Sequence, residues 1–232
     1  KRRHIHKATV RDRVVHQAVY RVLYPIFDKN FIFDSYSSRK LRGTHLGVER
    51  SFKAYRKLSK NWRLKTYVLK CDIRKYFDSI DHGILRELIF KKILCEDTRE
   101  LLDLIFNSFE KEKGKGLPLG NVTSQLFANI YLNEFDQFVK HTLKVKYYFR
   151  YCDDFIILSQ NRRYLEGLIA KIKDFLYENL SLTLHPNKIE IRNLRYGVDY
   201  LGYVALPHMI ILRTSTKRRV YRKIRIIIKK LE

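Results

Sequence analysis

The chain has 232 residues, 45% of them apolar, and a formal net charge of +24. This length and apolar content allow a sizeable core, in one large domain or two smaller ones, and exclude an intrinsically disordered chain. No run approaches the ~18 apolar residues of a membrane span, and there is no signal peptide, so we expect a cytoplasmic protein without a membrane partner.

The positive charge is concentrated near the two ends. Residues 1–65 contain 18 Lys and Arg against 4 Asp and Glu, and residues 213–232 contain 9 against 1. The segment between them, 66–212, contains 21 against 19 and is nearly neutral. Basic flanks around a centre that carries the acids fit a polyanion held at an acidic reaction site. The alternative is a basic surface kept for solubility, although a cationic excess of this size favours nucleic-acid binding anyway.

The three cysteines, Cys71, Cys95 and Cys152, have neither CxxC spacing nor a histidine at metal-ligand spacing. This pattern argues for a reducing compartment and against both a disulfide framework and a zinc site. The chain begins at Lys1 without Met and stops within a basic amphipathic stretch, 217–232, so we expect a fragment or a processed chain.

Helices are predicted for most of the first half of the chain. Apolar spacing favours a helix that opens at Asp12 and is bent or ended by Pro25, followed by helices over 46–60, 84–94 and 98–109. Between them, 34–45 is rich in Ser, Arg and Gly and is predicted to be a loop. Residues 67–72 are predicted to form a buried strand that ends on an acid.

The second half alternates between helices and short strands. The pattern predicts a mobile loop over 111–120, a long helix over 123–139, a hairpin over 147–158, a helix over 162–180, a strand near 181–191, and a hairpin formed by 197–206 and 209–213. This order indicates an α+β fold with helices packed on one face of an antiparallel sheet.

The tetrapeptide Tyr151-Cys152-Asp153-Asp154 places two adjacent acids between two apolar runs. Carboxylates at such a hairpin turn repel each other when both ionise, and they are rarely buried unpaired. A divalent cation removes the conflict, and hard oxygen ligands suit Mg²⁺. An Asp-Asp pair also occurs in ordinary exposed turns, so this turn alone is weak evidence of a metal site.

Asp72 provides a second acidic position, at the end of the predicted strand. Acids from two strand ends could hold two Mg²⁺ ions, one activating a 3′-hydroxyl and one steadying a triphosphate leaving group. The main-chain carbonyl of Ile73 could complete a ligand shell. The alternative for Asp72 is a helix N-cap, because a helical run follows it. With Asp153 and Asp154 also present, we favour the metal site.

Two further segments could contact a nucleotide, and each has a plainer explanation. Phe77 could block a ribose 2′-hydroxyl, or it could pack in the core. The Gly-rich segment 116–120 could approach a base or phosphate ahead of a helix N-terminus that favours anions. It could equally be a loop that ends in a Ser or Thr cap.

Basic and aromatic residues elsewhere give weaker signals. The loop that carries Arg39, Lys40 and Arg42 is suited to a triphosphate, or is an ordinary solvated loop. Lys188 could act as a general acid toward leaving pyrophosphate, or be a surface lysine. The tight aromatic turn Tyr200-Leu201-Gly202-Tyr203 could hold a primer backbone, or its rings could belong to the core.

Three segments in this order resemble the reverse transcriptases of bacterial retroelements: DIRKYFDSIDH at 72–82, GLPLGNVTSQLFANIYL at 116–132, and YCDD at 151–154. The likeness covers nearly the whole chain. It implies a right-hand polymerase fold, with fingers over 1–65 and part of 80–122, a palm over 66–212, and 213–232 as the beginning of a basic, truncated thumb.

The resemblance also implies roles for individual residues. The catalytic acids would be Asp72, Asp153 and Asp154, of which the first two bind metal most directly. The remaining implied contacts are the sugar gate Phe77, the nucleotide contacts Arg39, Arg42, Leu119 and Gly120, and the primer grip 200–203.

The loop before the long helix departs from the common pattern. Many reverse transcriptases have Gln before the second Gly and Ser-Pro beyond it, whereas this chain has Leu119-Gly120 and Ser124-Gln125. That variant resembles the diversity-generating retroelement branch, which copies a template RNA mutagenically, mostly at adenines, with an accessory variability protein. Because Leu offers only shape where Gln can hydrogen-bond near the nascent pair, discrimination should fall by ~1–3 kcal/mol at most.

We therefore predict RNA-templated DNA synthesis from deoxynucleoside triphosphates, on a template RNA with an RNA or cDNA primer, using two Mg²⁺ ions for which Mn²⁺ can substitute. One alternative is another bacterial reverse transcriptase, of the group II intron, retron, CRISPR-associated or phage-defence type. The other is a non-catalytic RNA-binding module on a palm-like fold. The intact acids argue against the module, because a pure RNA binder gains nothing from negative charge that faces phosphates.

Overall fold

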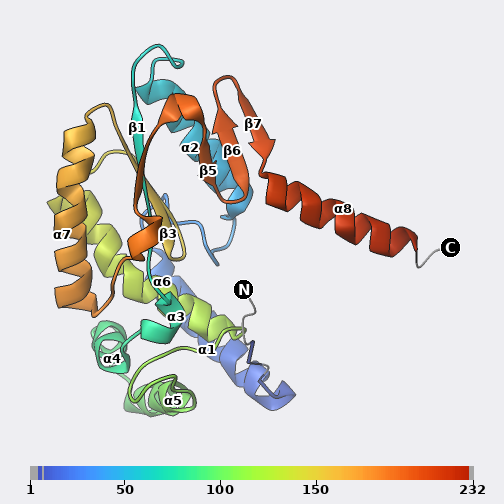
Figure 1. The fold of residues 1–232 in the computed structure, drawn as a ribbon. Helices are drawn as coiled ribbons and strands as arrows, with labels where there is room; N and C mark the ends of the chain where they lie inside the picture. The colour runs from blue at the N-terminus through green and yellow to red at the C-terminus, as the bar shows by residue number, and fades with distance from the viewer. Residues whose placement is uncertain (1–4, 7, 230–232) are drawn as a thin grey trace.

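The computed structural model describes residues 5–6 and 8–229 (Figure 1). Its helices are α1 (Val10–Asp28), α2 (Thr44–Leu58), α3 (Tyr76–Ser79), α4 (His82–Phe90), α5 (Glu96–Asn107), α6 (Val122–Gln137), α7 (Arg162–Leu180) and α8 (Thr214–Ile228). Short helical turns are η1 (Phe138–Thr142), η2 (Pro186–Lys188) and η3 (Leu194–Tyr196). The strands are β1 (Tyr67–Asp72), β2 (Tyr148–Tyr151), β3 (Asp154–Ser159), β4 (Glu190–Asn193), β5 (Val198–Tyr200), β6 (Tyr203–Leu206) and β7 (Met209–Leu212).

Strands β1 to β4 form an antiparallel sheet in the order β2-β3-β1-β4. The pairing of β1 with β3 runs from Tyr67 opposite Ser159 to Asp72 opposite Asp154. The end of β1 and the β2–β3 turn therefore lie at the same edge of the sheet. Strands β5, β6 and β7 form a second sheet by two consecutive hairpins.

Both faces of the four-stranded sheet are covered. Alternate strand residues point to opposite faces, and accordingly Cys71 and Phe155 belong to one core, with α6 and α7, while Val68 and Ile156 belong to another, with α2 and the second sheet. The α+β class is confirmed. The sequence predicted helices on one face, which α6 and α7 occupy, but it did not predict the apolar cover that α2 places on the other.

Helix α7 shows why the strongest periodic segments are predictable. Its buried residues recur every three or four positions along one stripe: Leu165, Leu168, Ile172, Leu176 and Leu180. The Asn161 side chain accepts a hydrogen bond from the Tyr164 amide and caps the N-terminus, and Ser181 ends the helix in the left-handed conformation. The observed bounds equal the predicted ones.

The predicted strand near 181–191 is wrong over most of its length. Pro186 begins a 3-10 turn, and the strand β4 covers only Glu190–Asn193. The predicted helix over 46–60 begins two residues earlier and ends at Leu58, because Lys60 and the two residues after it adopt positive φ angles. The last hairpin contains a third strand, and the long helix after the Gly-rich loop changes at Phe138 to a short π-helix.

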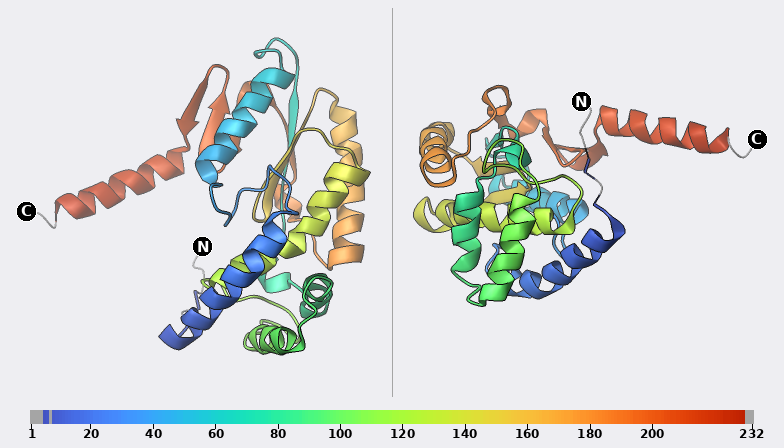
Figure 2. Two further views of the ribbon diagram at one scale, coloured as in Figure 1. Left: turned by 180° about the vertical axis from the view of Figure 1, so that it is seen from behind. Right: turned by 90° about the horizontal axis from the view of Figure 1, so that it is seen from below.

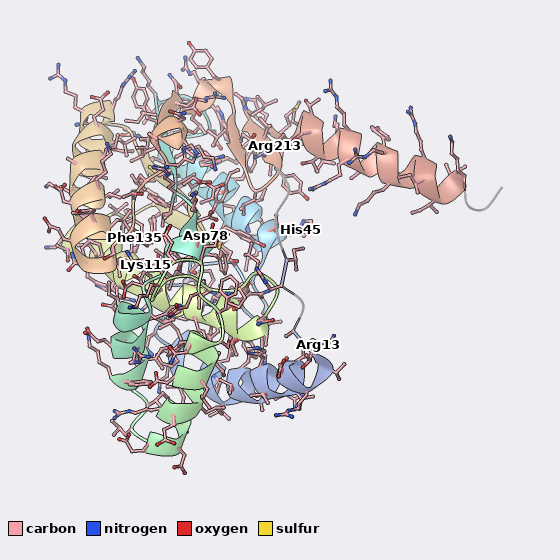
Figure 3. All side chains as sticks on the ribbon, turned by 60° about the horizontal axis from the view of Figure 1, so that its bottom comes forward. Arg13, His45, Asp78, Lys115, Phe135 and Arg213 are labelled. Atoms are coloured by element: carbon pink, nitrogen blue, oxygen red, sulfur yellow. The ribbon has the colours of Figure 1, made fainter. Side chains whose placement is uncertain are left out.

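Helix α8 projects away from both sheets in every view (Figures 1 and 2). It departs just after Arg213, and its side chains extend into solvent on several sides (Figure 3). None of its described residues is buried. The last residues of the predicted basic stretch, 230–232, lie outside the described residues. Of the helices within 8–229, none has the combination of length and apolar character that crossing a bilayer requires.

Candidate active site

Two acids that are far apart in the sequence meet at one edge of the sheet. Asp72, the last residue of β1, is paired directly with Asp154, the first residue of β3. The amide of Ile73 donates a hydrogen bond of 3.1 Å to the carbonyl of Asp153. Residues directly opposite in an antiparallel pair place their Cβ atoms about 4.5–5.5 Å apart on the same face. The carboxylates of Asp72 and Asp154 therefore share a face.

Asp153 lies in the tight turn between β2 and β3. Tyr151 and Asp154 are paired, so Cys152 and Asp153 are the two turn residues. Cys152 has φ of 56°, in the left-handed region that Gly usually occupies in such hairpins. A non-Gly residue held in this conformation is often found at functional sites.

The carboxylate of Asp154 is only partly satisfied within the protein. Its Oδ1 atom is buried and has no hydrogen-bond partner among the described residues, and its Oδ2 atom is 3.8 Å from the Lys70 ammonium. Burial raises the pKa of Asp154 to about 6; nearby Lys70 opposes this rise, while Asp72 and Asp153 add to it. An electron-rich, poorly satisfied oxygen beside a second acid is a chemical setting that a divalent cation would complete.

Asp72 is mostly buried and already has one cationic partner. The Lys188 ammonium lies 2.7 Å from its Oδ2 atom, with half of the Lys188 side chain exposed. The alternative that Asp72 caps a helix is wrong, since α3 begins at Tyr76 with Lys75 at the N-cap position and no side-chain cap. Lys188, predicted as a general acid, thus lies at the acidic edge rather than on a remote surface.

These acids do not form a closed metal cage. Among residues 5–6 and 8–229, no three His, Cys, Asp or Glu side chains surround one point as in an all-protein metal site. This agrees with Mg²⁺ chemistry, because Mg²⁺ is usually bound by one or two carboxylates together with water and substrate phosphates. The donor set of Asp72, Asp153 and Asp154 fits an ion that arrives with a triphosphate.

A fully buried ion pair supports the acidic turn from behind. The Arg150 guanidinium contacts both carboxylate oxygens of Asp136 at 2.7 and 2.6 Å, and neither side chain is exposed. Arg150 also donates to the carbonyl of Cys152 at 3.1 Å and to the hydroxyl of Ser35 at 3.0 Å. The turn that carries Asp153 is therefore fixed to a rigid buried group.

The same pair connects the turn to the loop after α1. The main-chain amide of Tyr36 donates to the Arg150 carbonyl, and the main-chain amide of Arg150 donates to the Asp34 carbonyl, both at 3.0 Å. The Asn129 amide group binds the carbonyl of Ser37 at 2.8 Å. We did not predict this network. The sequence held two signals of this network. One was Arg150, inside the apolar run before the acidic turn, and the other was Asp136, on a helix that is largely buried.

Arg39 and Arg42, the predicted triphosphate contacts in the basic loop, differ in how far their guanidinium groups are engaged within the protein. The Arg39 side chain is 5% exposed and binds the Asp28 carboxylate at 2.6 Å and the carbonyls of Ile32 and Ser35. With its donors engaged inside the protein, Arg39 braces the loop, which argues against a triphosphate contact. Arg42 is half-buried, and its guanidinium stacks 3.7 Å from the Phe33 ring centroid.

The Gly-rich loop is held by the N-terminal segment. The His6 amide donates a 3.0 Å hydrogen bond to the Leu119 carbonyl. Gly120 has φ of 125°, and a Cβ atom there would lie 2.9 Å from the His6 carbonyl oxygen. The close approach that Gly120 permits is thus to the chain itself. Leu119 is half-buried.

Phe77 and the aromatic turn 200–203 are each only partly buried, so both nucleic-acid contact and core packing remain as interpretations for them. Phe77 is half-buried in α3, with its ring centroid 5.5 Å from that of Tyr76, so packing accounts for part of its surface. Residues 200–203 form the predicted tight turn between β5 and β6, with positive φ at Leu201 and Gly202. Tyr200 is buried, and Tyr203 is half-exposed.

The sequence of this chain matches a family model. The model described as reverse transcriptase (RNA-dependent DNA polymerase) covers residues 1–205. The chain belongs to the reverse transcriptase family. The predicted family is thereby confirmed, and the narrower resemblance to the diversity-generating branch stays a prediction.

Curated relatives of this reverse transcriptase include bacterial proteins. Protein YkfC of Escherichia coli (strain K12) is 24% identical over an alignment of 259 residues, covering 94% of this chain and 64% of that protein. Group II intron-encoded protein LtrA of Lactococcus lactis subsp. cremoris is 30% identical over 145 residues, covering 60% of this chain and 23% of that protein. The chain spans less than two thirds of the length of either relative.

Solved structures share the fold of this reverse transcriptase. Apo telomerase of Candida tropicalis truncated from its C-terminal domain aligns with a TM-score of 0.61, over 87% of this chain and 44% of that one. Telomerase of the same organism in complex with a TWJ fragment of telomeric RNA aligns with a TM-score of 0.64, over 86% and 37%. Sequence identity is 16% in both, so the likeness concerns the fold, and it confirms the right-hand polymerase architecture.

Proposed function

We propose that this chain synthesises DNA on an RNA template by two-metal nucleotidyl transfer. The observation that carries the proposal is the direct pairing of Asp72 with Asp154, beside the turn that holds Asp153. Its substrates would be deoxynucleoside triphosphates and a primer, RNA or cDNA, annealed to template RNA in the cytoplasm.

Asp72 and Asp153 would hold two Mg²⁺ ions, with the Ile73 carbonyl near one of them, while Asp154 would shape the site and add negative charge. The bound ions would lower the pKa of the primer 3′-hydroxyl and neutralise charge on the triphosphate. The 3′-hydroxyl would lose its proton to solvent, its oxygen would bond to the α-phosphorus, and the bond from that phosphorus to the bridging oxygen would break, so that pyrophosphate leaves. Lys188, which lies 2.7 Å from Asp72, would donate a proton to that leaving group.

The basic flanks would hold the nucleic acid. Residues 1–65 and part of 80–122 would be the fingers, 66–212 the palm, and 213–232 the beginning of a thumb. Their Lys and Arg residues would contact phosphates without reading sequence, so affinity should fall steeply with salt. Arg42, Leu119, Gly120 and Phe77 would line the nucleotide site, and 200–203 would hold the primer end.

Within the family, we propose error-prone synthesis of the diversity-generating type, in which an accessory variability protein takes part. Its support is Leu119, which offers no hydrogen bond at the position where the family resemblance implies Gln in many reverse transcriptases. A group II intron-type enzyme is the second candidate, favoured by the similarity to LtrA. A template and variable repeat pair adjacent to the gene would distinguish the two.

The test is extension of a primer on a defined RNA template with Mg²⁺, each deoxynucleotide in turn, and sequencing of the products. Asp153→Asn should abolish extension, while the exposed Asp174→Asn on α7 should not. If wild-type protein binds the primer–template but never extends it, the chain is a non-catalytic RNA-binding module and the proposal fails.

A further inference from the structure

A second basic surface lies away from the acids. A surface hollow of about 510 Å³ at the end of α2 is lined by Lys53, Arg56, Lys57, Lys60, Asn61 and Arg63. All six of these residues are exposed, and none of them is acidic. The neighbouring carboxylate of Glu49 contacts the Lys53 ammonium at 2.5 Å, but it does not line the hollow. Five cations therefore face one space.

This basic hollow is built by a helix end and a constrained loop. Lys53, Arg56 and Lys57 follow the i, i+3, i+4 spacing of one face of α2, and Lys60 lies just beyond its last residue, Leu58. Beyond the helix, three consecutive residues from Lys60 to Trp62 have positive φ angles, and the Asn61 amide binds the Arg56 carbonyl at 2.8 Å. Trp62 is buried against Phe52, with ring centroids 5.4 Å apart. The backbone beneath the cations is thus fixed in an uncommon conformation.

Helix stabilisation does not account for all of these charges. Cations in the last turn of a helix, here Arg56 and Lys57, interact favourably with the helix dipole. That effect is confined to the terminal turn, and Lys53 is paired with Glu49 on the same helix, so Lys60 and Arg63 are left without a helix-based reason to face the same hollow.

The hollow lies at the opposite end of the sheet from the acids. Its loop leads directly into Tyr67, the first residue of β1, whereas Asp72 is the last. A six-residue strand spans about 17 Å from one end to the other. Figure 1 shows the loop between α2 and β1 at the top of the sheet, with α3 beyond the other end. Phosphates bound in the hollow are therefore not those that react.

We propose that the basic hollow binds the phosphate backbone of a double-helical RNA segment outside the catalytic cleft. None of the lining residues is aromatic, and the nearby Trp62 ring is buried, so the site offers no platform on which unpaired bases could stack. Double-stranded RNA is instead recognised largely through its backbone and shape. This site does not depend on the polymerase activity proposed above, since binding alone reports on it.

The test compares two triple variants of the full chain. One carries Lys53→Gln, Arg56→Gln and Lys60→Gln in the hollow. The matched control carries Arg163→Gln, Lys171→Gln and Lys173→Gln, three exposed cations on α7, which packs on the other face of the sheet. Anisotropy measures binding of a labelled blunt RNA hairpin, and of a single-stranded uridine oligomer, at several salt concentrations.

For the hollow variant, we expect hairpin affinity to fall about tenfold and the slope of log K against log salt to fall in magnitude by about two, whereas affinity for the uridine oligomer should fall less than about threefold. The control variant should bind both probes like the wild type. Equal loss in both variants would refute a distinct site, and equal loss of both probes would refute the double-helical class. Should the hollow variant unfold, Lys57→Gln with Arg63→Gln replaces it. Failure of wild-type primer extension would count only against the polymerase proposal.

Discussion

The guanidinium of Arg150 donates a 3.1 Å hydrogen bond to the carbonyl of Cys152, the first residue of the acidic turn. The same guanidinium is fully buried against Asp136 and binds Ser35 in the loop after α1. The position of Asp153 is therefore tied to a charge pair that cannot move without exposing uncompensated charge to a low-dielectric interior.

Replacing Asp136 with Asn should destabilise the protein by about 3–5 kcal/mol, because the Arg150 charge would stay buried without its partner. Urea unfolding measures the change. The control is Glu190→Gln, which breaks an exposed pair with Arg192 and should cost less than about 1 kcal/mol. Equal costs for the two variants would show that the buried pair does not hold this region.

Asp154→Asn should stabilise the protein in the absence of metal. The variant removes a largely buried carboxylate whose Oδ1 atom has no hydrogen-bond partner among the described residues and whose Oδ2 atom has only the Lys70 ammonium, at 3.8 Å. Raising a carboxyl pKa from 3.8 to about 6 corresponds to up to about 3 kcal/mol at neutral pH. Thermal unfolding without Mg²⁺ measures this change in stability, and thermal unfolding with Mg²⁺ measures how much the ion stabilises each protein. Mg²⁺ should stabilise the wild type more than the variant. A variant that unfolds at lower temperature in metal-free buffer would contradict this reading of Asp154.

His16 should make stability depend on pH. Its ring is buried between Asn121 and Thr123, with contacts of 3.1 and 2.9 Å, and burial lowers its pKa below 6.5. The unfolded chain therefore takes up this proton first as pH falls. The stability contributed by neutral His16 is present above pH 6.5 and lost as pH falls from there through the folded-state pKa.

Urea unfolding between about pH 7 and pH 5 should show a shallower loss of stability in His16→Gln than in the wild type. The exposed His141→Gln serves as the control and should keep the wild-type slope. An unchanged slope in His16→Gln would mean that the imidazole does not link α1 to the start of α6 in the way described.

Leu119→Gln should raise fidelity. A hydrogen-bonding side chain near the nascent pair should reduce misincorporation opposite template adenine by about fivefold, the equivalent of about 1 kcal/mol. Sequencing of products made on one RNA template measures the error rate. The exposed Leu104→Gln on α5 should have no effect. Unchanged misincorporation in Leu119→Gln would remove the physical basis for the error-prone assignment.

The elements predicted well are those whose signal is local. Strand β1 and helix α7 were located to the residue, because a short apolar run and a regular apolar stripe each specify one structure. The strand over 181–191 failed because Pro186 supports a 3-10 turn that the alternation of side chains does not reveal. The cover that α2 gives to the second face depends on contacts between distant segments.

The acids Asp72, Asp153 and Asp154 were predictable because their positions at a strand end and in a hairpin turn indicate a metal site. The ion pairs that hold the surrounding segments in place were not predictable. Nothing local in the sequence says that Arg150 pairs with Asp136 or that Arg39 is engaged by Asp28. An arginine in a basic loop looks the same whether it faces a ligand or an internal carboxylate. Lys70 was missed for the same reason, because its neighbour Asp154 lies across the sheet.

The central claim is that Asp72 and Asp153 together hold two divalent ions at this edge of the sheet. Electron paramagnetic resonance can count bound Mn²⁺ in the protein with primer–template and a non-hydrolysable nucleotide. We expect two ions in the wild type and fewer in both Asp72→Asn and Asp153→Asn, with Asp174→Asn unchanged. Wild-type protein that binds no Mn²⁺, or equal occupancy in all four proteins, would contradict it.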